Sequence, residues 1–138
     1  MTLKEIVTEL NSIAIRQPNV HKFIISGDIY ELNDTDVEYA AFCATQQNVS
    51  ENDSFRTYNF NLFYVDRLDD SKDNLIDVQS HAIEVLDNIV NTFIDNHFEV
   101  EITSKSFTTF TQRFLSLCAG AYCTINISIP VNNCVEIF

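Results

Sequence analysis

The sequence predicts an α+β fold, with one mostly antiparallel sheet of about five strands and two helices on one face. Two segments carry apolar residues at helical spacing, several runs alternate as strands do, and the order is helix, three strands, long helix, two strands. The chain has 138 residues, of which 46% are hydrophobic. It is long enough to bury a core, so we expect a single α+β domain over residues 1–138.

The first helix is predicted to start at Thr2 and to end near Pro18. Thr2 and Glu5 have the spacing of a capping box, in which each side chain binds the other residue's backbone N–H. Apolar residues recur behind them at helical spacing: Leu3, Ile6, Val7, Leu10, Ile13 and Ala14. This stripe is wide enough to lie on a sheet.

Three strands are expected next. Residues 20–30 and 37–49 are strand-like and flank turn-forming residues 33–36, so we expect them to form a hairpin. In the run 55–66 one face is apolar by strict alternation: Tyr58, Phe60, Leu62 and Tyr64. The other face is polar in its first half and apolar in its second, which predicts a strand that enters a covered region.

The longest helix is expected from about Asn74 to Asp95, because one of its faces is apolar. Two strands follow it. The run 98–110 alternates less regularly than residues 121–129, which alternate without interruption up to Pro130.

The net charge is −12, from 20 acidic and 8 basic residues. Such a chain would repel nucleic acid, although it could suit a basic protein surface. The start of the sequence does not have the pattern of a secretory signal, and no window of 18 apolar residues exists, so we expect neither secretion nor a membrane span. We expect the four cysteines to be reduced and mostly buried: Cys43, Cys118, Cys123 and Cys134.

Residues that could carry chemistry have simpler structural explanations. His21, His81 and His97 form no ligand-spaced pair. Cys118, beside the apparent turn at Gly120, is better explained by packing than by reactivity. We therefore predict no catalytic residues, no cofactor, no metal site and no enzymatic activity.

The densest carboxylate cluster consists of Asp66, Asp69, Asp70, Asp73 and Asp77. Its spacing does not match a calcium-binding EF-hand loop, and the glycine that such a loop needs is missing. We interpret it as a solvated loop that favours the start of the following helix through the helix dipole. Whether it binds a metal stays open.

The predicted sheet has more aromatic surface than two helices need to cover. An aromatic second sheet face is typical of a surface that meets a protein partner. The predicted oligomer interface comprises Tyr58, Phe60, Leu62, Tyr64 and Tyr122.

Two stretches resemble small neck and tail proteins of phages that infect Bacteroidetes, including crAss-like phages. They are FNLFYVDRLDDSKDNL (60–75) with Gln79 and Ser80 in the next helix, and FLSLCAGAY (114–122) with a closing Ile-x-Ile-x-Ile-Pro strand. These phage proteins are similar to the tail-terminator, or tail-completion, group. Their motifs cover about 40 residues here, although the layout extends over most of the chain.

The resemblance implies a non-enzymatic virion subunit, made in the bacterial cytoplasm, that forms a ring between portal and tail. DNA would pass through the ring without specific binding, and the carboxylates Asp66, Asp69, Asp70, Asp73 and Asp77 would line the lumen and repel its phosphates. Ring closure needs head-to-tail contacts, for which the runs 55–65 and 121–129 are the candidate sheet edges. The alternative is an acidic protein-binding module or inhibitor that engages a basic partner surface.

Overall fold

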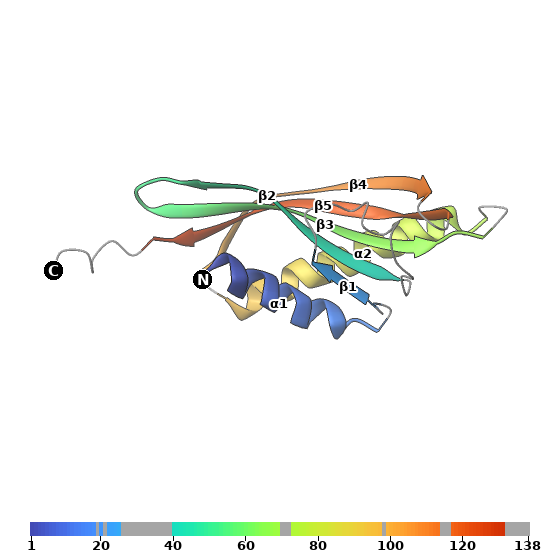
Figure 1. The fold of residues 1–138 in the computed structure, drawn as a ribbon, viewed down its shortest axis with the longest axis horizontal. Helices are drawn as coiled ribbons and strands as arrows, with labels where there is room; N and C mark the ends of the chain where they lie inside the picture. The colour runs from blue at the N-terminus through green and yellow to red at the C-terminus, as the bar shows by residue number, and fades with distance from the viewer. Residues whose placement is uncertain are drawn as a thin grey trace.

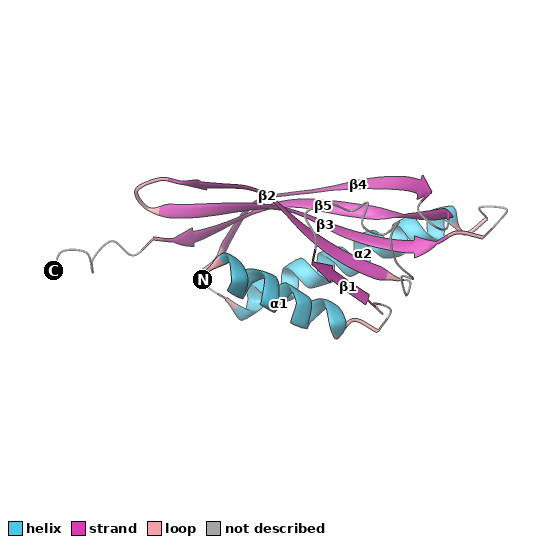
Figure 2. Ribbon diagram, in the orientation of Figure 1, coloured by secondary structure: helices cyan, strands magenta, loops and turns pink. Residues whose placement is uncertain are grey.

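The computed structural model describes residues 1–18, 20, 22–25, 40–69, 73–97, 99–113 and 117–131. It has the elements α1 (Leu3–Ile15), β1 (Lys22–Ile25), β2 (Ala41–Glu51), β3 (Phe55–Arg67), α2 (Leu75–Asn96), β4 (Glu101–Arg113) and β5 (Leu117–Pro130). Both helices lie on the same side of the sheet (Figures 1 and 2), as the sequence predicted. The fold is therefore α+β.

The five strands form one sheet in the order β1-β2-β3-β5-β4. The pairs β2–β3, β3–β5 and β5–β4 are antiparallel. The turn between β2 and β3 projects beyond the end of the helix layer in Figure 1. No helix among the described residues is both long enough and apolar enough to cross a lipid bilayer.

The predicted hairpin between residues 20–30 and 37–49 is wrong, because β1 and β2 pair in parallel. A parallel pair needs a crossover of about a dozen residues or more, and the 15 residues from 26 to 40 are enough to return the chain to the starting end. The predicted turn at residues 33–36 lies outside the described residues.

The runs proposed as sheet edges are also placed differently. They correspond to β3 and β5, the two strands that have a partner on both sides along most of their length. Regular alternation marked these strands because one face of each is buried in the core. The outer edge beyond β5 is formed instead by β4, most of whose described side chains are exposed.

The capping box at the start of α1 is confirmed. The Glu5 N–H donates to Thr2 Oγ1 (3.2 Å), and the Thr2 N–H donates to Glu5 Oε1 (3.3 Å). Two of the N–H groups that a helix leaves unpaired at its start are thus satisfied. The buried stripe of α1 consists of Ile6, Leu10, Ile13 and Ala14.

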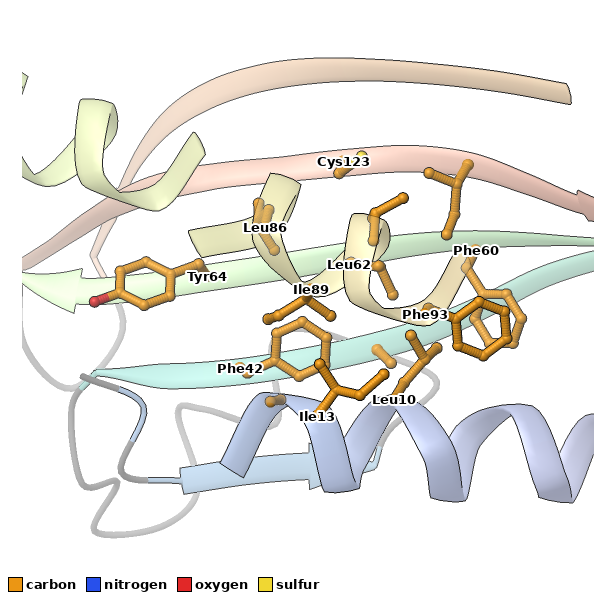
Figure 3. Packing of buried hydrophobic residues seen from close by; sticks show 14 of the residues in the cluster. Leu10, Ile13, Phe42, Phe60, Leu62, Tyr64, Leu86, Ile89, Phe93 and Cys123 are labelled. Carbon is orange, nitrogen blue, oxygen red and sulfur yellow. The ribbon is translucent and has the colours of Figure 1, made fainter. Parts of the chain in front are cut away.

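The core lies between the two helices and one face of the sheet (Figure 3). Phe42 of β2, Phe60 of β3 and Ile125 of β5 meet Leu86, Ile89 and Phe93 of α2 in one buried cluster. Burying side chains of this size contributes about 1.5–3 kcal/mol each. The seven buried residues of α2 follow helical spacing, which explains its length without special capping: Val78, Ala82, Val85, Leu86, Ile89, Val90 and Phe93.

Candidate interaction surface

The sheet face opposite to the helices has no helix over it in the described part of the chain (Figure 2). The register places on it alternate residues of β2, β3, β5 and β4. We call the following side chains the open face: Thr45, Asn48, Ser50, Thr57, Asn59, Asn61, Phe63, Ser104, Ser106, Thr108, Phe110, Tyr122, Thr124, Asn126 and Ser128. None of them carries a charge. The register places one charged side chain at each end of this face, Arg67 of β3 and Glu101 of β4, and these two charges sum to zero on a chain of net charge −12.

Side chains of the open face bind one another across the strands. The Asn59 amide donates to Asn126 Oδ1 (2.7 Å), and the Asn126 amide donates to Ser104 Oγ (3.0 Å). Thr57 Oγ1 and Ser128 Oγ lie 2.9 Å apart in a further hydrogen bond. Hydrogen bonds between uncharged side chains thus link β3, β5 and β4.

The second row of this network is centred on Asn61. Its side-chain oxygen accepts from Thr124 Oγ1 (2.7 Å), and its backbone carbonyl accepts from Thr45 Oγ1 (3.3 Å). A face that stays in water has no need of such pairs, because water satisfies polar groups equally well. Polar groups that are already paired lose less when water is removed, so this face is suited to being covered by another surface.

Three aromatic rings end the open face near the start of β5. Phe63 lies 5.1 Å from Tyr122 and 6.1 Å from Phe110, measured between ring centroids, and the second pair is edge-to-face. All three side chains are half-buried. Beside them Val65 and Cys43 are fully buried, so β3 does run from a polar region into a covered apolar one, as predicted.

The five residues predicted as an oligomer interface lie on two different faces. Tyr58, Phe60, Leu62 and Tyr64 are 0–4% exposed and belong to the core under the helices. Their alternation marked a buried face, but the helices of the same chain cover it, so they are not available to a partner. Tyr122 alone of the five lies on the open face.

The acidic residues from the end of β3 to the first turn of α2 lie at one end of the molecule (Figure 1). Asp69, Asp73 and Asp77 are exposed, Asp66 is half-buried, and Asp70 lies outside the described residues. Asn74 organises this segment: its amide donates to the Arg67 carbonyl (3.3 Å), and its oxygen accepts from the Asp69 N–H (2.9 Å). Asp77 stands in the first turn of α2, where the helix dipole favours a negative charge.

Metal ligands do not converge in the described part of the chain, where no group of three or more His, Cys, Asp or Glu side chains could hold an ion. His81 packs edge-to-face on the Tyr64 ring, at 5.7 Å between centroids. His97 follows the last turn of α2 and lies 3.8 Å from carboxylate oxygens of both Glu9 and Glu99. Both positions are explained by packing or by local charge.

The cysteines of the described strands are buried thiols: Cys43, Cys118 and Cys123. Burial raises the pKa of Cys123 to about 12. Because the thiolate is the nucleophile, a raised pKa leaves this sulfur unreactive near neutral pH. Cys134 lies outside the described residues.

Known protein families gave no match to this chain, and neither did curated protein sequences. The candidate surface therefore rests on geometry alone. Sequence reasoning noted that Thr57, Asn59 and Asn61 share a polar face but did not predict that they bind residues of β5. Asn126, which alternates with apolar residues of β5, was the available signal.

Proposed function

We propose that this protein is a non-enzymatic structural subunit that works by packing against copies of itself and against neighbouring proteins of an assembly. The observation that carries the proposal is the open face. It has no net charge on a chain of net charge −12, because the charges of Arg67 and Glu101 at its two ends cancel, and several of its polar groups are already bonded to one another. Two acidic molecules approach each other most easily through a surface of this kind.

The size of the open face supports the proposal. Four strands about 4.8 Å apart, each contributing about seven residues at about 3.3 Å, cover roughly 400 Å². A stable protein interface buries about 800 Å² on each partner. The open face therefore provides about half of an interface of ordinary size, with its aromatic end supplying the apolar part.

The finer proposal places the subunit in a phage virion, as a ring in the neck or tail that joins the portal to the tail and surrounds the DNA exit channel. It rests on the resemblance of residues 60–75 and 114–122 to phage neck and tail proteins. In such a ring Asp66, Asp69, Asp70, Asp73 and Asp77 would face the channel, where carboxylates repel DNA phosphates and keep the duplex from binding. A ring structure in which these residues point outward would refute the lumen assignment.

The second candidate is an acidic module that binds a basic protein surface. The exposed carboxylates of α2 favour it, among them Asp77, Glu84 and Asp95. Size-exclusion chromatography with light scattering separates the two candidates. A ring subunit should form a defined high oligomer, alone or on the preceding ring, whereas a module should remain a monomer or dimer until a basic partner is added.

A further inference from the structure

β4 is an edge strand that side chains of α2 hold in place. It pairs with β5 along one side. Lys105 Nζ lies 2.6 Å from Asp87 Oδ1 of α2, and the Gln79 amide of α2 donates to the Phe110 carbonyl (3.2 Å). These contacts keep an exposed strand in its extended form, so that a partner strand would not have to order it on binding.

Residues 106–112 of β4 lack the features that usually keep edge strands from pairing. Proteins protect an edge with proline, charged side chains, bulges or a short strand. The bulge of β4 lies at Thr103 and its mid-strand charge at Lys105, both before residue 106. Residues 106–112 (SFTTFTQ) contain no charge and no proline, and Ser106, Thr108, Thr109 and Thr111 are exposed.

The opposite side of the sheet has a complementary segment. Among the described residues, the pairing of β1 with β2 covers Ala41 to Ala44, while β2 continues to Glu51. The side chains from Gln47 to Glu51 are exposed. The bulge of β2 lies at Gln47, so the regular part of this segment is residues 48–51. The three antiparallel pairings make β2 and β4 run in opposite directions. β4 of one copy placed beside β2 of another thus gives an antiparallel pair with the helices on the same side of both sheets.

Charge favours the same pairing. The charged residues of β4 are Glu101, Lys105 and Arg113, which lie outside residues 106–112 and sum to +1, whereas residues 46–51 of β2 carry only Glu51 and sum to −1. On a chain of net charge −12 these are two segments where copies can meet without like-charge repulsion.

We propose that residues 106–112 of β4 add as a strand to residues 46–51 of β2 in a second copy of this chain. This proposal rests on the proposed self-association and names the two strands through which the copies bind. Main-chain hydrogen bonds between the two edges would supply the affinity, as in other cases of strand addition. Because two different edges meet, each copy offers a free edge to the next, and the contact repeats until the ring closes. The open face stays available for a neighbouring ring protein.

Crosslinking of two variants, each with one added cysteine, tests this contact; the native Cys43, Cys118 and Cys123 are buried. Asn48→Cys and Thr108→Cys lie on the same sheet face, in a background in which Cys134 is replaced by serine. We expect a short bismaleimide to link the two proteins when they are mixed, since opposed side chains of paired strands lie about 5 Å apart at Cβ. A mixture of Asn48→Cys with Ser80→Cys, an exposed position on α2, should give no link.

Three results would contradict the proposal. If Thr108→Cys crosslinks to a second copy of itself, the contact is a two-fold β4–β4 pair. If the protein forms an oligomer but the mixture gives no crosslink, the copies bind through other surfaces. Either result leaves self-association standing, whereas a monomer at every concentration, with or without a preceding ring, would refute both proposals. As a second measurement, Thr108→Glu should weaken association about tenfold or more, and Ser80→Glu, with the same charge change, should not.

Discussion

Replacing Gly120 by alanine should destabilise the fold more than any other single methyl addition to the described strands. A Cβ at this position would lie 1.8 Å from the Tyr64 carbonyl oxygen and 2.9 Å from the Tyr64 carbonyl carbon. Ordinary contacts begin at 3.4 Å, so the two strands would have to separate by 3.4 − 1.8 = 1.6 Å at this point. The obstacle is backbone of a central strand, which no rotamer change can relieve.

The cost combines two effects. Overpacking costs about 1–3 kcal/mol, and each main-chain hydrogen bond lost between β3 and β5 adds about 1 kcal/mol. We expect the free energy of unfolding to fall by about 3–5 kcal/mol. With an unfolding entropy of about 2.1 cal/mol/K per residue, this lowers Tm by roughly 10–17 °C.

Urea and thermal unfolding, followed by circular dichroism, measure this loss. Thr108→Ala on the exposed edge strand is the matched control, and it should change stability by less than about 1 kcal/mol. If Gly120→Ala unfolds within about 1 kcal/mol of the unmodified protein, the close approach of β3 and β5 at this position is wrong.

Four further predictions concern single side chains. The Tyr64 hydroxyl is buried without a hydrogen-bond partner among the described residues, so Tyr64→Phe should raise the urea midpoint, by about 1 kcal/mol of stability, and a loss would indicate a hidden partner. Burial raises the pKa of the Cys123 thiol from 9.0 to about 12, so the folded protein keeps this proton at a pH at which the unfolded chain has already lost it. Above about pH 9 the free energy of unfolding should therefore fall by about 1.4 kcal/mol per pH unit because of Cys123. Cys123→Ala should remove this part of the pH dependence. Thr2→Ala should cost about 1 kcal/mol through loss of the capping box, seen in the same urea titration. Asn126→Asp puts a charge on the open face and should weaken binding to a neighbouring protein of the assembly, measured by light scattering of the mixture, whereas Asn88→Asp on the exposed side of α2 should not; equal effects would argue against the open face as a contact surface.

Periodicity predicted the elements well where one face is buried. The spacing of Leu86, Ile89 and Phe93 placed α2 within one residue of its observed bounds, and the alternation of β3 and β5 identified both strands. The same signal misled the choice of contact surface. Alternation indicates that one face of a strand is covered, but it does not show whether a helix of the same chain or a partner protein covers it.

The local sequence pattern could not predict which strands pair. β1 and β2 pair in parallel, and β5 inserts between β3 and β4, because of contacts between segments far apart in the sequence. The hydrogen bond from Asn59 to Asn126 joins residues 67 positions apart. No spacing rule within one strand predicts such a bond, so the open face became visible only in the structure.

Electron microscopy of intact virions, with an epitope tag on this chain, tests the central claim most directly. We expect a ring of tagged copies between capsid and tail, with β4 of each copy beside β2 of the next and the acidic segment between β3 and α2 facing the channel. Particles that lack the tagged chain altogether would contradict the proposed virion function.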